Sequence, residues 1–352
     1  MIGPELPLPS FFDPDKVGHI WRVPYEERAL QAVEWARKHD IQPAARDRIK
    51  IGLVVIDVQI AFCIPGGELF VAGYSGMDAV SDNQRLCKFI YHNLNRITHI
   101  SATLDTHQAM QIFHGIFFVN AHGEHPQPYS LISHEDIVSG RWKFNPLVAE
   151  SLNVDVNYAQ QHLLHYTKTL KERGKYDLTI WPYHVMLGGI GHALVPSFEE
   201  SIFFHTVARQ GQADMILKGQ HPLTEHYSVI GPEVMAGPDG KPLAAKNTKF
   251  LEMVQNYDMV IMTGQAKSHC LSWSVDDFLT DIHSTDPQLA GKVYLLVDTT
   301  SPIVVPGVVD YGAEAETAFN RFAQAGVNLV KTTNSIETWP GVKEIVDRIS
   351  NH

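Results

Sequence analysis

The sequence predicts an α/β protein, a three-layer α/β/α sandwich built around a six-stranded parallel sheet. Short apolar runs recur along the chain, and the first, IGLVVID at 51–57, is typical of a strand buried on both faces. Helical patterns lie between most of these runs, and strands that alternate with helices indicate a parallel sheet covered on both sides.

The elements follow in a regular order. Strands are expected at 51–57, 97–105, 213–219, 257–264, 292–298 and 327–332. Helices are expected at 25–39, 77–95, 198–210, 269–283 and 312–325. For the helix at 198–210, Ser197 and Glu200 predict a capping box, and Gly211 predicts the end.

Two segments stand outside this rhythm. Residues 1–48 form an N-terminal extension rich in proline, whose helix at 25–39 offers Leu30, Val33 and Trp35 for packing on the main domain. The main domain covers 49–352 and contains an insertion at about 114–179, rich in Pro, His and aromatic residues. Because so long a segment inside a compact fold is usually functional or structured, we expect an inserted lid and not a separate domain.

Composition narrows the class of protein. The net charge is 28 − 39 = −11, which disfavours nucleic acid or an anionic membrane as partner. Three cysteines among 352 residues form no disulfide framework and suggest a reducing compartment. The first residues lack the basic and apolar regions of a secretory signal, and no apolar run is long enough to span a membrane. We therefore expect a soluble, cytoplasmic protein.

Reactive side chains follow the ends of the predicted strands, where open parallel sheets bind ligands. Asp57 ends the first strand, Lys218 lies at the end of the third, and Cys270 begins a helix after the fourth. A helix N-terminus and a nearby cation both lower a thiol pKa, so Cys270 is the predicted nucleophile, with Lys218 as cation and Asp57 as proton acceptor. Cys63 is a weaker competitor without a helix start behind it, and Cys87 falls in mid-helix, where packing is expected.

The same edge predicts a metal site. Asp105 ends the second strand, and His107 follows two residues later. His184, in the WPYH segment at 181–184, is the best third ligand, and His114 is a weaker one. An Asp/His/His set leaves open coordination positions and suits Zn, Fe or Mn as a single divalent ion.

Together these residues resemble the nicotinamidase branch of the isochorismatase-like cysteine hydrolase superfamily. The similar segments are DVQIAFC (57–63), TLDTH (103–107), WPYHVMLGGIG (181–191), LKG (217–219) with Tyr227-Ser228, and GQAKSHC (264–270). The resemblance implies the isochorismatase-like hydrolase fold and the catalytic set Asp57, Lys218 and Cys270. It implies aromatic pocket walls from Phe62 and Trp181, and a metal, zinc above all, on Asp105, His107 and His184. It also implies an oxyanion hole from the amides of Ala266 and Cys270, with a cis peptide between Gln265 and Ala266, and a homo-oligomer.

The chain departs from the family pattern in three places. Ala61 stands where the family frequently has an Asp. AKSHC stands where A-T-D-x-C is common, so that Lys267 and Ser268 change the charge near the pocket. The insertion at about 114–179 is absent from the compact members of the family. The leading hypothesis is hydrolysis of nicotinamide or a similar aromatic carboxamide to the acid and ammonia through a Cys270 thioester. The alternatives are a cysteine hydrolase for another amide, ureide or carbamoyl compound, a non-catalytic metal- and ligand-binding homologue, and a metalloamidase that attacks with a metal-activated hydroxide.

Overall fold

The computed structural model describes residues 3–283 and 285–350. Its centre is a six-stranded, all-parallel sheet in the order β12-β9-β8-β1-β2-β7. The strands are β1 (Ile51–Ile56), β2 (His99–Asp105), β7 (Asp214–Lys218), β8 (Met259–Gly264), β9 (Val293–Leu296) and β12 (Asn328–Val330). All six strands expected from the sequence are confirmed.

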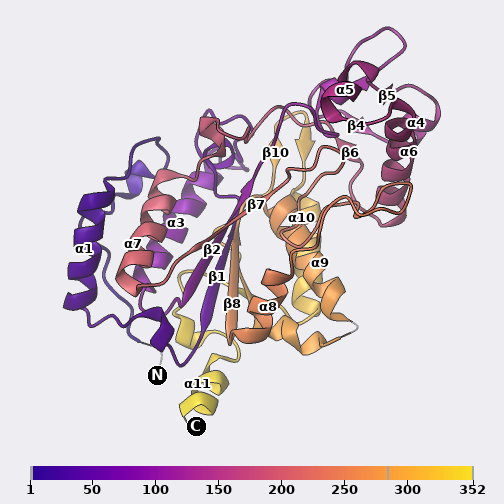
Figure 1. Cartoon of the computed structure of the whole chain (residues 1–352). Helices are drawn as coiled ribbons and strands as arrows, with labels where there is room; N and C mark the ends of the chain where they lie inside the picture. The colour runs from indigo at the N-terminus through magenta and orange to yellow at the C-terminus, as the bar shows by residue number, and fades with distance from the viewer. Residues whose placement is uncertain (1–2, 284, 351–352) are drawn as a thin grey trace.

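Helices cover both faces of this sheet, which confirms the three-layer fold (Figure 1). The helices are α1 (Tyr25–Lys38), α2 (Ile60–Cys63), α3 (Asp78–His92), α4 (His134–Val138), α5 (Ala149–Leu152), α6 (Val156–Glu172), α7 (Pro196–Arg209), α8 (Thr248–Asn256), α9 (Ser272–His283), α10 (Gly312–Gln324) and α11 (Val342–Ser350). Side chains alternate along the central strands: in β1, Leu53 and Val55 join the core under α3 and α7, whereas Val54 and Ile56 join the core under α8, α9 and α10. The alternation explains why the runs are continuously apolar, since both faces are buried.

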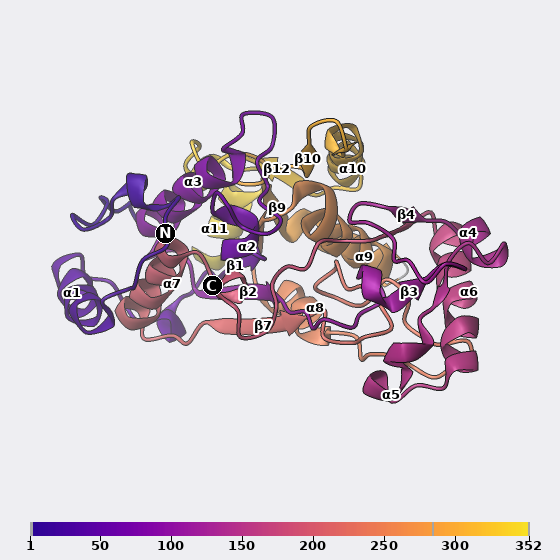
Figure 2. The ribbon, with the colours of Figure 1, turned by 90° about the horizontal axis from the view of Figure 1, so that it is seen from above.

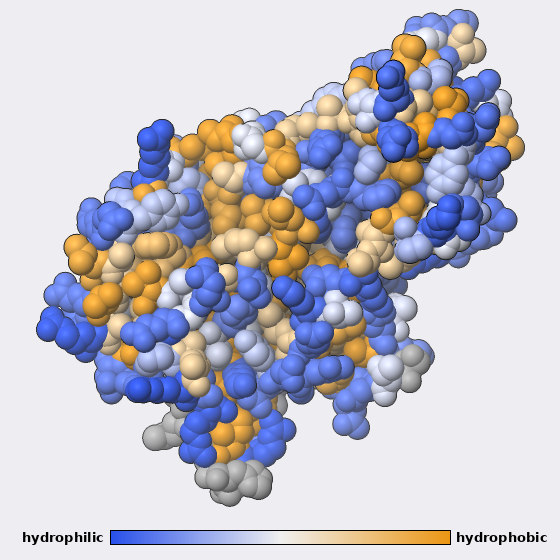
Figure 3. Space-filling model, in the orientation of Figure 1, coloured by the Kyte–Doolittle hydropathy of each residue, from blue (hydrophilic) through white to orange (hydrophobic). Residues whose placement is uncertain are grey.

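The N-terminal arm packs on the outside of α7. Its Leu6, Ala32 and Ile41 form a small core with side chains of α3 and α7. The prediction that Leu30 and Val33 pack on the main domain is wrong, because these side chains are 75% and 61% exposed. Apolar surface is visible over the α1 side of the molecule in Figure 3.

The capping box expected for α7 is also wrong. The helix begins at Pro196, and its N-cap, Val195, has no side-chain hydrogen bond. The Glu200 carboxylate instead receives a hydrogen bond of 2.5 Å from Arg28 Nε of the arm. Glu200 therefore forms a tertiary ion pair with Arg28 instead of the capping box that the local pattern predicts.

The part of the chain from β2 to about residue 179 projects from one end of the sheet and carries α4, α5 and α6, whereas α7, which precedes β7, lies against the sheet (Figure 2). Its short strands form two antiparallel pairs, β3 (Phe118–Val119) with β5 (Lys143–Phe144) and β4 (Leu131–Ile132) with β6 (Leu178–Thr179). A third pair, β10 (Val304–Val305) with β11 (Val309–Asp310), follows β9. The buried Phe113, Phe117 and Phe118 belong to the same core as α3 and α7, so the inserted segment continues the main core.

None of the helices in residues 3–283 and 285–350 is both long and apolar enough to cross a membrane.

Candidate active site

The carboxyl ends of β1, β7 and β8 bring Asp57, Lys218 and Cys270 together. Lys218 Nζ lies 2.8 Å from Asp57 Oδ2 and donates to Cys270 Sγ at 3.5 Å. Its other neighbours are Asp105 Oδ1 at 3.2 Å and the carbonyl of His226, which accepts a hydrogen bond of 3.0 Å. Lys218 is thus the shared cation of two carboxylates and a thiol, all of them buried.

Asp57 is held in an unusual backbone conformation just after β1. Its φ is +48°, a left-handed value that non-glycine residues rarely adopt and that is found more often at functional sites. The Thr103 hydroxyl donates to Asp57 Oδ1 at 2.5 Å, and the Asp57 amide donates to the same hydroxyl oxygen at 3.0 Å. Thr103 on β2 therefore fixes both the backbone and the carboxylate.

Close contact between β1 and β8 requires a residue without a side chain at the end of β8. Gly264 has φ +113°, and a Cβ there would lie 2.1 Å from the Ile56 carbonyl oxygen. The chain then passes through the cis peptide between Gln265 and Ala266, as expected from the resemblance. Cys270 follows in a π-helical turn, Lys267–Leu271, directly before α9.

Burial sets the ionisation of the three groups. Burial raises the pKa of Cys270 well above the usual value of a thiol, and the nearby Lys218 opposes this rise. Burial also raises the pKa of Asp57 against the pull of Lys218. For Lys218, burial favours the neutral amine, but Asp105 and Asp57 outweigh it and raise the pKa well above its ordinary range. The resting site therefore holds a thiol beside a charged ammonium and a carboxyl group with raised proton affinity.

Of the three groups, Cys270 lines a narrow cavity with aromatic and apolar walls. Its lining is formed by Phe62, Leu69, Val71, Asp105, His107, Trp181, His184, Glu225, Tyr227, Gln265, Ala266, His269, Cys270 and Ile303. The Trp181 indole N–H donates to the Tyr227 hydroxyl at 2.8 Å, and the Phe62 ring contacts His184 with ring centres 5.4 Å apart. The residues predicted as pocket walls and as oxyanion-hole donors therefore face the same space as the predicted nucleophile.

A histidine cluster lies at one end of this cavity. His107, His114 and His184 are buried, and one ring nitrogen of each lies within 4.8 Å of the others. His114 Nδ1 is 3.1 Å from the Ala109 carbonyl and His184 Nδ1 is 2.7 Å from that of Pro182. Because a carbonyl only accepts, both rings carry their proton on Nδ1 and present an unprotonated Nε2.

The electrostatics of the cluster suit metal ligation. Burial lowers the pKa of His114 to about 4 and that of His184 to about 3, so both rings are neutral. Burial opposes ionisation of Asp105, but His107 and Lys218 outweigh it and lower the Asp105 pKa. Asp105 Oδ2 lies 3.1 Å from His107 Nε2. Neutral imidazoles beside a carboxylate are the donor set of zinc and related ions.

The space around the cluster fits an ion as well. His114 Nε2 and His107 Nδ1 are buried without a hydrogen-bond partner in the described part of the chain. Gly219 has φ +84° and no side chain beside this cluster. A Cβ at this residue would lie 2.5 Å from Asp105 Oδ1 and 3.3 Å from His107 Nε2. Buried imidazole nitrogens without a partner, beside a glycine that leaves room next to Asp105 and His107, are consistent with a metal site.

Sequence reasoning missed two buried groups of this cavity and misplaced a third. Glu225 is buried with Oε2 unpartnered, and burial raises its pKa well above the usual value. His269 has an unpartnered Nε2. Lys267 does not face the cavity, since its ammonium pairs with Glu316 and lies 4.6 Å from the centre of the Phe319 ring. Glu225 lies in an irregular loop, where neither periodicity nor a strand end could have indicated it.

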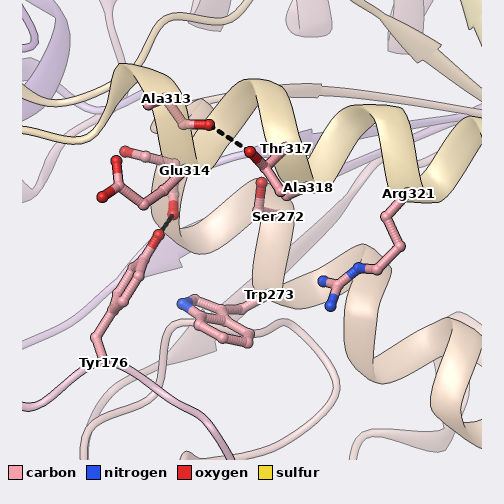
Figure 4. A pocket seen from close by; sticks show the side chains of 9 residues that line it. Tyr176, Ser272, Trp273, Ala313, Glu314, Thr317, Ala318 and Arg321 are labelled. Atoms are coloured by element: carbon pink, nitrogen blue, oxygen red, sulfur yellow. Dashed lines mark hydrogen bonds between the residues drawn. The ribbon is translucent and has the colours of Figure 1, made fainter.

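A larger hollow of about 350 Å³ lies between α9 and α10 (Figure 4). Its walls include Tyr176, Trp273, Glu314 and Arg321, and the Tyr176 hydroxyl donates to the Ser268 carbonyl at 3.1 Å. None of the predicted catalytic residues or histidine ligands lines it, so it is not the reaction site.

Comparisons with known proteins give similarities of structure. The chain matches no protein-family model and no curated protein. It is similar to the solved structure of a nicotinamidase/pyrazinamidase from Acinetobacter baumanii, with 19% identity over 82% of this chain and 98% of that one, at a TM-score of 0.49. It is also similar to the yeast nicotinamidase (16% identity over 80% and 99%, TM-score 0.49) and to the zinc complex of the Pyrococcus horikoshii pyrazinamidase (18% over 80% and 99%, TM-score 0.41). All three identities are below 20%, so these similarities establish no activity for this chain.

Proposed function

We propose that this chain is a cysteine amidohydrolase that converts nicotinamide, or a similar aromatic carboxamide, to the acid and ammonia. The observation that carries the proposal is the position of Lys218 Nζ, 2.8 Å from Asp57 and 3.5 Å from Cys270, whose side chain lines a cavity with aromatic walls. A buried thiol that shares a cation with a carboxylate has the parts needed for nucleophilic attack on a carbonyl carbon.

The reaction follows from the state of these groups. As the Cys270 sulfur attacks the amide carbon, its proton passes to Asp57, whose raised pKa suits it to accept a proton and later release it. Lys218 stays charged and balances the negative charge, which moves from the Asp57 carboxylate to the sulfur and the substrate oxygen, and later back to Asp57. Asp57 then donates its proton to the departing ammonia, and takes one from the water that hydrolyses the thioester. The amides of Ala266 and Cys270 are the proposed donors to the oxyanion.

The walls position a flat substrate. Phe62 and Trp181 line the cavity and offer aromatic faces on which a substrate ring stacks. The Tyr227 hydroxyl accepts a hydrogen bond from the Trp181 indole and so fixes the position of this wall. A divalent metal, zinc in the first place, held by Asp105, His107 and His184 with His114 beside them, would supply a Lewis-acid contact for a substrate nitrogen or oxygen.

An ammonia-release assay tests the proposal. The wild-type chain is assayed on nicotinamide and a panel of amides, ureides and carbamoyl compounds, with metal analysis of the same sample. Cys270→Ala should abolish turnover, and an acyl adduct on Cys270 should appear in rapidly quenched wild-type samples.

Cys63→Ala is the matched control. Cys63 is also buried, burial raises its pKa to about 12, and it is not part of the cavity lining. It should therefore keep wild-type turnover. Turnover that survives in Cys270→Ala and stops with a chelator would instead favour a metalloamidase. Binding of the amides without turnover by the wild type would favour a non-catalytic homologue.

A further inference from the structure

His269, the residue directly before the nucleophile, has a donor that the proposed reaction does not use. Its side chain is 2% exposed and lines the same cavity as Cys270. Its Nε2 atom is buried and has no hydrogen-bond partner in the described part of the chain. A buried polar atom without a partner destabilises the free protein and can be satisfied by a ligand.

A short chain of hydrogen bonds fixes which nitrogen carries the proton. The Ile303 amide donates to Ser268 Oγ at 3.1 Å, and Ser268 Oγ lies 2.8 Å from His269 Nδ1. No other acceptor for the Ser268 hydroxyl proton occurs among residues 3–283 and 285–350, so this hydroxyl donates to Nδ1. Burial lowers the pKa of His269 to about 3, so the ring is neutral and its single proton lies on Nε2.

The surroundings of the ring leave this N–H without a lone pair to bind. Four aromatic rings pack around His269, and their centres lie 4.6 to 5.5 Å from the centre of its ring. They belong to Tyr176, Trp181, Tyr227 and Tyr311. Trp181 and Tyr227 are also walls of the cavity. A substrate ring in this cavity would therefore find one neutral N–H donor in an otherwise aromatic wall.

We propose that His269 is a specificity-determining residue, whose Nε2–H donates to a second acceptor atom on the substrate, apart from its carboxamide. The substrate class that follows is an aromatic carboxamide that carries an acceptor in addition to a nicotinamide-type ring nitrogen, such as an ether or carbonyl oxygen. This inference rests on the proposed amidohydrolase function. Ser268 is a positioning residue in it, since it holds the tautomer.

The test compares pairs of substrates that differ in one atom. Nicotinamides with a methoxy or an ethyl group at ring positions 5 and 6 have nearly the same shape, but only the methoxy compounds carry the acceptor. For at least one position, the wild type should prefer methoxy over ethyl by about 5- to 10-fold in kcat/KM, as expected for one net hydrogen bond. The preference should appear mainly in KM.

Variants then separate the donor from the ring. His269→Phe keeps a flat ring and removes the donor, so its methoxy-to-ethyl ratio should fall to about one. His269→Gln keeps an N–H donor and should recover part of the ratio. Ser268→Ala frees the tautomer and should lower the ratio without changing the residue in contact with substrate. A purely structural role would reduce turnover of both substrates equally.

Failure of this inference and failure of the proposed function give different results. If the wild type hydrolyses amides but His269→Phe keeps the wild-type ratio at both positions, or the wild type has no preference, the inference is wrong and the reaction stands. If the wild type hydrolyses none of them, the reaction is wrong. Calorimetric binding of the same pairs to wild type and His269→Phe then decides whether Nε2–H recognises the acceptor.

Discussion

Replacing Lys218 by Met should damage both folding and chemistry. The side chain is 1% exposed and lies 2.8 Å from Asp57 and 3.2 Å from Asp105. At an effective dielectric constant of about 20, these contacts are worth about 6 and about 5 kcal/mol of Coulomb attraction. Much of this is offset by removing Lys218 from water, and loss of one partner of a buried pair typically costs about 3–5 kcal/mol. We expect a loss of that size in the free energy of unfolding.

Lys175→Met is the matched control. The Lys175 side chain is also buried, at 4% exposure, and its ammonium lies 3.2 Å from Glu233 and 3.4 Å from Asp277. Its ammonium stands 3.8 Å from the centre of the Trp273 ring. The electrostatic loss should therefore be similar. Lys175 touches no catalytic group, so only Lys218→Met should also lose at least about 10³-fold in kcat/KM once rates are normalised to folded protein.

The stability loss should depend on pH in a defined direction. Burial raises the pKa of Asp57 in the folded state and Lys218 opposes it, so removing Lys218 raises that pKa further. A carboxyl with a raised folded-state pKa stabilises the fold below its unfolded pKa, and this contribution is lost as pH rises through the folded value. The free energy of unfolding of Lys218→Met should therefore fall further below the wild-type value at pH 8 than at pH 5.

Urea denaturation at both pH values and ammonia release from the best amide substrate provide the measurements. If Lys218→Met were as stable as wild type at pH 8, the predicted stabilisation by the ion pairs of Lys218 would be refuted. Turnover within about tenfold of Lys175→Met would refute the catalytic role of Lys218.

Three further changes test other parts of the molecule. Asp57→Asn should lower kcat by about 10²–10⁴-fold with little change in KM, because it removes the proton acceptor, and wild-type kcat would disprove that role. His114→Ala should weaken zinc binding by at least about tenfold in a chelator competition, whereas His99→Ala, outside the cluster, should not; equal affinities would remove His114 from the site. Arg28→Met should lower the free energy of unfolding by about 3–5 kcal/mol, since it leaves Glu200 buried without its 2.5 Å partner, and unchanged stability would show that the arm is not anchored there.

The sheet could be predicted from the sequence because its pattern is dictated locally. A strand buried on both faces needs a continuous apolar run, and a polar residue such as Asp57 or Lys218 marks where the apolar run ends. Since all six strands are parallel, those ends meet at one edge. The proximity of Asp57, Lys218 and Cys270 follows from these facts without knowledge of any loop.

Features set by tertiary contacts could not be predicted in this way. The local pattern predicts a helix cap for Glu200, but a buried pair with Arg28, distant in sequence, competes successfully for its carboxylate. The position of Lys267 close to Cys270 in the sequence predicts a change of charge near the pocket, but the Lys267 ammonium pairs with Glu316 instead. In both cases the deciding partner lies far along the chain, where no local pattern could indicate it.

The origin of each cavity residue separates the proposed reaction from the choice of substrate. Lys218 belongs to the hydrogen-bond ladder of β2 and β7, and Asp57 directly follows β1, which pairs with β2, so their relative positions depend little on the loops. Trp181 and Glu225 come from the long segments on either side of β7, which no ladder of the sheet constrains. Changes in these segments can therefore alter which amide fits while leaving the Lys218–Asp57 distance unchanged. On this reasoning, substrate preference should respond to substitutions in the segments and at His269, and the requirement for Cys270 should not.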